Sequence, residues 1–152
     1  MADTQPTTET RGETCTLVSK SCTTSAFDTF GELWLCPSGL LRTALGLRKT
    51  LKRGIEEDWK VVGAARPTRG FSGSEIASLG MAGKHNHWIS WGHVRDANLK
   101  LGIIEHSLHL TLVNGTRVVF GWPKWDGGFD FLAQELPQAL GTRLTLHRRW
   151  IG

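Results

Sequence analysis

Residues 106–122, HSLHLTLVNGTRVVFGW, contain the most regular pattern in the chain. Apolar and polar side chains alternate on both sides of Asn114-Gly115, a dipeptide typical of tight β-turns. A two-residue turn would mix apolar and polar side chains on both faces of the hairpin. A three-residue loop with a left-handed Gly115 in a β-bulge instead pairs Leu110 with Val118 and makes one face apolar. The other pairs are then Leu112 with Thr116, Leu108 with Phe120 and His106 with Trp122, and the polar face carries His109, Thr111 and Arg117.

The sequence after Pro123 changes to a helical period. Asp126 is a suitable N-cap, Pro137 should bend or end the last turn, and Gly141 is a suitable stop. The apolar stripe of this predicted helix consists of Phe129, Leu132, Ala133, Leu136 and Leu140.

The first half of the chain contains three candidate strands. TCTLVSKSC is β-branched and partly alternating. GELWLC and LLRTAL flank Pro37-Ser38-Gly39, which predicts two strands joined by a tight turn, because Pro37 presets the φ angle that such a turn needs. The Thr-rich residues 1–13 are short of apolar side chains and are predicted to be a disordered tail.

Residues 46–87 interrupt this pattern with Gly, Pro, Arg and Lys, so we predict a long insertion. It contains one short helix signal, SGSEIASLGMAG, in which Ser72 and Glu75 can form a capping box. HWISWGHVRDANLKLG (87–102) then predicts a strand pair or a bent strand. RLTLH (143–147) is compatible with a return to the sheet.

Several antiparallel strands followed by one amphipathic helix favour a mainly β (α+β) domain. We predict an antiparallel curved sheet or partly open barrel of about six to seven strands, capped by a C-terminal α-helix. The 152 residues are enough for a single domain, which we place at residues 14–147, followed by a basic C-terminal end at 148–152.

Three stretches resemble bacterial pleckstrin-homology-like (PH-like) and GRAM-like domains. GELWLCPSGLLRT resembles the hairpin that opens many of these domains, HWISWGHVRDANLK is similar to their next strand, and SLHLTLVNGTRVVFGW is similar to the hairpin before the closing helix. The resemblance covers residues 14–147 and implies a PH-like scaffold that binds proteins or membranes. It implies no particular ligand, because Lys20 is the only cation where phosphoinositide-binding members carry paired Lys or Arg.

Composition predicts a cytoplasmic protein. No stretch approaches the about 18 apolar residues of a membrane span, and the N-terminus lacks the basic-then-apolar pattern of a secretory signal. Cys15, Cys22 and Cys36 are an odd set without a CxxC pair, so we expect free thiols. The formal net charge of +4 slightly favours anionic partners.

GLRKTLKRG (46–54) is the most basic stretch. On a helix, Arg48 lies four residues before Lys52, and Lys49 lies four residues before Arg53, so this segment could rest on an anionic membrane. We favour a solvated face whose charge is offset by the three acids that follow. Nucleic acid is not favoured as a partner, because no recognised binding motif is present.

GWPKWDGG (121–128) is the second candidate site. Exposed together, Trp122 and Trp125 would form an apolar anchor for a partner protein. We favour a strand-to-helix corner, in which one indole fills the end of the barrel and the other packs on the helix.

Neither a catalytic site, a metal site nor a cofactor is predicted. Nothing in the sequence fixes a third metal ligand beside His85 and His87, and no nucleophile elbow, phosphate loop or dinucleotide fingerprint is present. The candidate ligands or general bases are His85, His87, His93, His106 and His109.

We therefore expect a non-enzymatic intracellular interaction or adaptor module whose partner is another protein. The first alternative is peripheral binding to an anionic membrane through Arg48, Lys49, Lys52 and Arg53. The second is a small-ligand or metal pocket lined by Trp and His residues. An open strand edge could also allow self-association.

Overall fold

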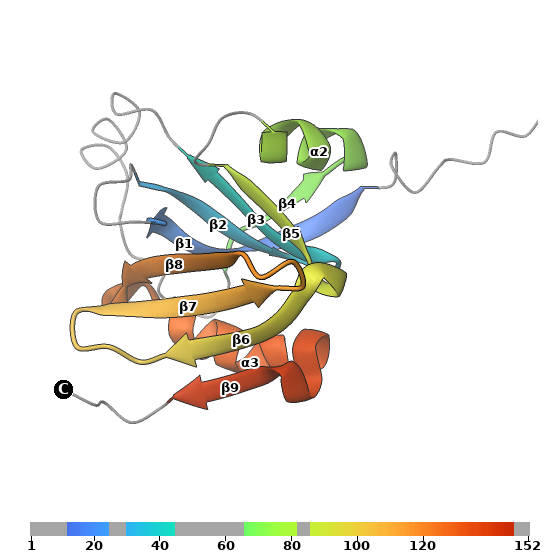
Figure 1. Cartoon of the computed structure of the whole chain (residues 1–152). Coiled ribbons are helices and arrows are strands. Elements are labelled where there is room, and N and C mark those ends of the chain that lie inside the picture. The colour runs from blue at the N-terminus through green and yellow to red at the C-terminus, as the bar shows by residue number, and fades with distance from the viewer. Residues whose placement is uncertain (1–11, 25–29, 45–65, 82–85, 148–152) are drawn as a thin grey trace, which may run out of the picture.

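The computed structural model describes residues 12–24, 30–44, 66–81 and 86–147, which form two β-sheets with two α-helices (Figure 1). Sheet A has the strand order β4–β1–β2–β3–β5, and sheet B has the order β8–β7–β6–β9. The strands of sheet A are β1 (Glu13–Cys22), β2 (Gly31–Cys36), β3 (Gly39–Ala44), β4 (Thr68–Phe71) and β5 (His87–Ser90). The strands of sheet B are β6 (Val94–Lys100), β7 (Glu105–Leu112), β8 (Arg117–Pro123) and β9 (Leu144–His147).

The helices cover the sheets and connect them. In the described part of the chain they are α2 (Gly73–Met81), η2 (Trp91–His93), η3 (Lys124–Asp126), α3 (Gly128–Leu140) and η4 (Gly141–Arg143). The helix α2 packs on the outer face of sheet A, and η2 leads the chain from sheet A into sheet B. The helix α3 packs on the core between the two sheets (Figure 1).

The architecture is mainly β (α+β) and PH-like, as predicted, with two sheets, a C-terminal helix and a sheet that stays open. Thr23 and Gly121 exchange two backbone hydrogen bonds of 2.8 Å, which join β1 to β8 at one corner. The described residues form nine strands, more than the about six to seven expected. The additional pairings are β4 on β1 and a parallel pairing of β9 on β6.

The predicted insertion contains β4 and α2. The capping box at the start of α2 is confirmed, because Ser72 N–H donates to Glu75 Oε1 and Glu75 N–H donates to Ser72 Oγ, both at 3.0 Å. The rest of the insertion, the tail before Gly12 and the basic end at 148–152 lie outside the described residues.

The predicted hairpin register is confirmed. Leu110 pairs with Val118, and the Leu112 N–H donates to the carbonyl of Thr116 at 2.8 Å. Gly115 has a φ of 89°, the left-handed conformation that the bulged turn requires. The pairing therefore directs the side chains of Leu108, Leu110, Phe120 and Trp122 into the interior.

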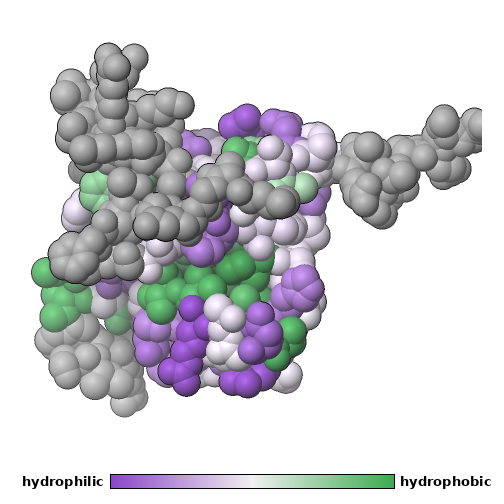
Figure 2. Space-filling model, turned by 45° about the horizontal axis from the view of Figure 1, so that its top comes forward, coloured by the Kyte–Doolittle hydropathy of each residue, from purple (hydrophilic) through white to green (hydrophobic). Residues whose placement is uncertain are grey.

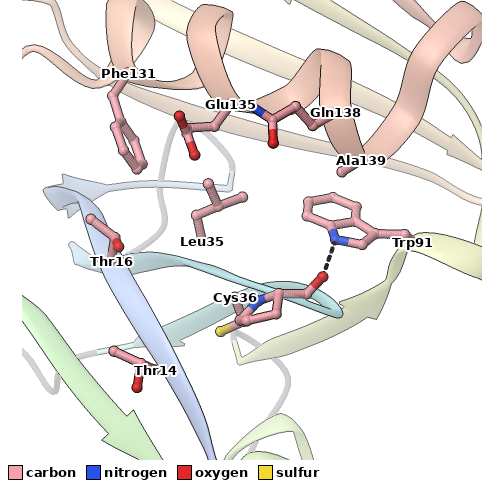
Figure 3. A pocket seen from close by; sticks show the side chains of 10 residues that line it. Thr14, Thr16, Leu35, Cys36, Trp91, Phe131, Glu135, Gln138 and Ala139 are labelled. Atoms are coloured by element: carbon pink, nitrogen blue, oxygen red, sulfur yellow. Dashed lines mark hydrogen bonds between the residues drawn. The ribbon is translucent and has the colours of Figure 1, made fainter.

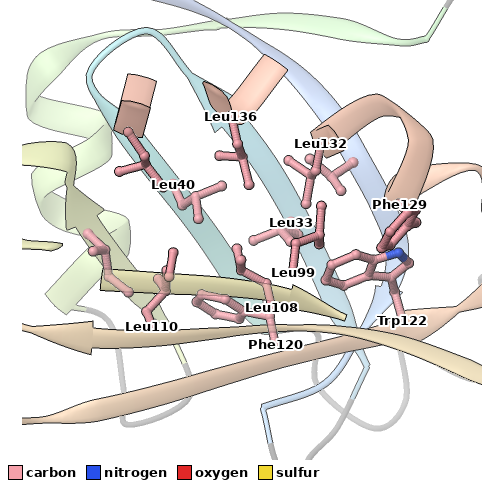
Figure 4. Packing of buried hydrophobic residues seen from close by; sticks show 14 of the residues in the cluster. Leu33, Leu40, Leu99, Leu108, Leu110, Phe120, Trp122, Phe129, Leu132 and Leu136 are labelled. Atoms are coloured by element: carbon pink, nitrogen blue, oxygen red, sulfur yellow. The ribbon is translucent and has the colours of Figure 1, made fainter. Parts of the chain in front are cut away.

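The apolar stripe of α3 is buried as predicted, and it faces the two sheets (Figure 4). One detail of this helix differs from the prediction, because the N-cap is Gly127, with a φ of 78°. Asp126 lies one residue earlier, where its Oδ1 accepts the Gly128 N–H at 3.0 Å. Pro137 lies inside the helix, which ends at Leu140 with Gly141 as its C-cap, the predicted stop.

Sheet A separates two apolar clusters. The main core lies between the sheets and α3 and includes Leu33, Leu40, Leu108, Phe120 and Trp122 (Figure 4). The outer core lies between sheet A and α2 and consists of Cys15, Leu17, Trp34, Cys36, Leu41, Phe71 and Ile76. Because both faces of β2 and β3 are covered, these strands are nearly continuous apolar runs instead of alternating ones.

The prediction of free thiols was wrong for two of the three cysteines. Thr16 pairs with Leu35, so Cys15 lies opposite Cys36 on the neighbouring strand, with the Cα atoms 4.3 Å apart, and the two form a disulfide. Cys22 is buried and takes no part in the disulfide. The argument for a cytoplasmic location therefore loses the support of the cysteines, and that location stays a prediction.

Arg143 connects the end of α3 to both sheets. Its Nη1 donates to the carbonyls of Trp91 and Val94 at 2.8 Å each. Its Nε and Nη2 donate to the carbonyls of Leu140 and Ala139 at 3.3 and 3.2 Å. One guanidinium thus satisfies carbonyls at the helix C-terminus and at the passage from sheet A to sheet B.

Candidate functional site: a pocket between α3 and sheet A

A pocket of about 390 Å³ lies between α3 and the β1–β2 part of sheet A (Figure 3). Its volume falls within the range of small-ligand sites in proteins, about 300 to 1,000 Å³. Its lining residues are Thr14, Thr16, Leu35, Cys36, Pro37, Trp91, Phe131, Glu135, Gln138 and Ala139.

Local structure places these side chains on opposite walls. Along β1, Cys15 belongs to the outer core, so its neighbours Thr14 and Thr16 point to the other face, toward α3. On α3, Glu135 and Gln138 are three residues apart and therefore share one side of the helix, beside the buried stripe.

Most polar side chains of this pocket have no side-chain partner among the described residues. Thr14, Thr16, Glu135 and Gln138 form no side-chain hydrogen bond or ion pair with any described residue. The exception is Trp91, whose Nε1 donates to the carbonyl of Pro37 at 3.0 Å and so fixes the indole at one end of the pocket (Figure 3). The walls therefore offer four uncommitted polar groups to a ligand.

Arg66 lies beside the pocket and is engaged elsewhere. Its guanidinium donates to the carbonyls of Leu17, Val18 and Asp126, and it lies 5.2 Å from the centre of the Phe131 ring. Burial lowers the pKa of Arg66, and the nearby Asp126 carboxylate acts in the opposite direction. This arginine therefore holds β1 against η3.

Asp126 is the counter-charge of Arg66 and is nearly fully buried. Burial raises the pKa of Asp126, while the Ser19 hydroxyl, the Gly128 N–H and Arg66 partly offset that increase. The Arg66–Asp126 pair thus belongs to the junction between β1 and α3, and neither carboxylate oxygen lines the pocket.

The predicted basic site, Arg48, Lys49, Lys52 and Arg53, lies outside the described residues.

The two tryptophans of the second predicted site, Trp122 and Trp125, differ in their exposure to solvent. Trp122 is 0% exposed in the main core, so it cannot be an exposed anchor, and this agrees with the part of the corner interpretation in which one indole fills the interior. Trp125 is 51% exposed and follows Lys124, whose N–H donates to the Ile104 carbonyl at 3.2 Å.

Figure 2 shows a hydrophobic patch between hydrophilic residues on one face of the molecule. Ile103 and Ile104, in the connection between β6 and β7, are 55% and 74% exposed. Nothing in the structure shows what covers them, and we assign them no ligand.

The described histidines do not converge on a site. His93 lies beside Ser90, His109 lies beside Ser107, and the His87 ring packs against Phe120. His85 lies outside the described residues. No group of three His, Cys, Asp or Glu side chains in the described ranges is arranged to hold a metal ion.

His106 is buried near the start of β7. Its Nδ1 accepts the Gly102 N–H at 3.0 Å, which requires an unprotonated Nδ1. Burial lowers the pKa of His106; Lys124 adds to this decrease and Asp130 opposes it.

We expect the free energy of unfolding to fall as the pH decreases below about 6.5, where the unfolded chain binds a proton more readily than the folded one. Urea unfolding of wild type and His106→Gln between about pH 5 and 8 measures this. The substitution should reduce the slope of the free energy of unfolding against pH. Equal slopes for wild type and His106→Gln would exclude this role.

No known protein-family model matches the chain, and no curated protein matches it. None of the helices in the described part of the chain is both long enough and apolar enough to cross a lipid bilayer.

Sequence reasoning missed the pocket residues. Thr14, Thr16, Glu135 and Gln138 have the types expected on any exposed face, and only the placement of α3 over β1 brings them together. One alternative predicted from the sequence was a pocket lined by Trp and His side chains. Trp91 lines this pocket, and no described histidine does.

Proposed function

We propose that this chain is a non-enzymatic interaction module on a PH-like scaffold, and that it binds a segment of a partner protein in the pocket between α3 and sheet A. The observation that supports the proposal is the set of uncommitted polar groups around an apolar floor. Such a mixture, with a few polar groups that fix orientation, is typical of binding sites.

The position of the pocket defines how a partner would be recognised there. β1 is paired with β2 and β4, and β2 is paired with β1 and β3, so neither strand has a free edge at the pocket. A partner segment in the pocket would therefore be recognised through its side chains. Strand addition would need one of the sheet edges, which in the described structure are β4, β5, β8 and β9.

A blocking variant tests the proposal. Peptides selected from a random display library on the wild-type chain should bind the Thr14→Trp variant at least about tenfold more weakly, because the indole fills the pocket. Thr145→Trp is the matched control, since Thr145 is also an exposed strand residue and does not line the pocket. Fluorescence anisotropy gives the affinities, and a thermal melt confirms folding.

Three results are informative. Loss of binding only in Thr14→Trp supports the pocket as the docking site. Equal binding to both tryptophan variants would reject the pocket, and failure to enrich any peptide on the folded wild-type chain would reject the interaction module itself.

A further inference from the structure

We propose that the pocket accepts a positively charged side chain, a lysine or an arginine of the partner segment. This inference rests on the proposed function and adds the chemical class of the group that the pocket selects. It follows from the charge, the aromatic walls and the free hydrogen-bonding groups of the pocket.

The pocket carries a negative charge, that of Glu135. Among its ten lining residues, Glu135 is the single ionisable side chain that carries a formal charge, and its carboxylate points into the space between α3 and sheet A (Figure 3). No described residue forms an ion pair or a side-chain hydrogen bond with Glu135. A ligand cation would therefore meet a carboxylate without an internal counter-ion, although the chain as a whole has a net charge of +4.

The walls suit the apolar parts and the delocalised charge of such a side chain. Phe131 and Trp91 lie at opposite ends of the pocket, with Leu35 between them (Figure 3). Aromatic faces attract ammonium and guanidinium groups, and aliphatic stems of Lys and Arg pack on apolar surface. The Phe131 ring already has one such contact, with the guanidinium of Arg66 at 5.2 Å.

The remaining polar groups can accept hydrogen bonds from the same cation. Thr14 and Thr16 offer hydroxyl oxygens, and Gln138 offers an amide oxygen, all without internal partners among the described residues. An ammonium has three donors and a guanidinium has five, so a single carboxylate leaves donors to satisfy. The pocket thus supplies several acceptors within one volume.

Neither Arg66 nor Arg143, the arginines beside the pocket, serves as the counter-ion of Glu135. Arg66 is held by three backbone carbonyls and lies near Asp126, and Arg143 is held by four backbone carbonyls. Both therefore have fixed partners away from Glu135.

Small probes test the inference. The lysine and arginine probes are the Nα-acetyl N-methylamides of these amino acids, and the norleucine and citrulline derivatives are their uncharged counterparts. The experiment follows ¹H–¹⁵N chemical shifts of the full chain during titration, with the indole N–H of Trp91 as the reporter, assigned from Trp91→Phe. We expect saturable shifts at the pocket with a Kd on the order of 1 mM for the cations, and at least about tenfold weaker binding of the neutral probes.

Two variants that remove the same charge from the same helix provide the control. Glu135→Gln should abolish the preference for the cationic probes, whereas Asp130→Asn should keep it, because Asp130 is exposed and does not line the pocket. Raising the salt concentration should weaken cation binding to the wild type and leave the neutral probes unaffected.

The outcomes separate this inference from the proposed function. Equal binding of neutral and cationic probes at the pocket would overturn the cation preference and leave the pocket as a binding site. The same applies if Glu135→Gln keeps the preference. Absence of any shift at the pocket with probe on the order of 10 mM would overturn the inference, while peptide binding that depends on Thr14 would still support the module.

Discussion

Arg143→Ala is expected to lower the free energy of unfolding by about 3 kcal/mol, the range for losing several hydrogen bonds to a charged group. The substitution leaves four carbonyls, those of Trp91, Val94, Ala139 and Leu140, without the donor that they share. It also removes a cation from the C-terminal end of α3, where the helix dipole favours positive charge. Urea unfolding followed by circular dichroism measures the change.

Two comparisons separate the hydrogen bonds from other contributions. Arg143→Met keeps the aliphatic stem and should lose nearly as much stability, because the donors are gone. Arg117→Ala, at an exposed position on β8, should change the free energy of unfolding by no more than about 0.5 kcal/mol. A loss below about 1 kcal/mol for Arg143→Ala would show that α3 is held mainly by its apolar stripe.

The double variant Cys15→Ala/Cys36→Ala should be less stable than the wild type by about 3 kcal/mol. The disulfide joins residues 21 apart in sequence, and a cross-link of this span restricts the unfolded chain by about that amount. Both cysteines also lie in the outer core, so the substitutions remove some packing under α2. Denaturant unfolding without a reducing agent measures the difference.

A thiol titration checks that Cys15 and Cys36 form a disulfide. The chain unfolded without reductant should expose one reactive thiol, that of Cys22, and the reduced chain should expose three. Cys22→Ala serves as the packing control and should cost about 1 kcal/mol, because it removes a buried side chain and no cross-link. Three reactive thiols before reduction would contradict the disulfide.

The elements that were predicted correctly are those whose pattern is local. The pairing of Leu110 with Val118 follows from alternation and the Asn-Gly turn, and the capping box at Ser72 and Glu75 lies within one turn of helix. The buried stripe of α3 follows from the helical period alone. In these cases neighbouring residues carry all of the necessary information.

The features that were missed depend on the relative placement of distant segments. The disulfide requires the register of β1 against β2, which sets Cys15 opposite Cys36, and a count of cysteines contains no register. The pocket requires α3 to lie over β1, so that Glu135 and Thr16 line the same space. The strand β9 was foreseen only as compatible with the sheet, because its parallel pairing with β6 depends on the preceding turn at Arg143.

The outer core joins the second face of sheet A to α2. The segment that contains β4 and α2 enters the chain between β3 and β5 and covers Leu17, Trp34 and Leu41 on sheet A. Without that segment these three side chains would face water, where large apolar side chains favour aggregation. The covering segment is therefore what allows sheet A to carry apolar side chains on both of its faces.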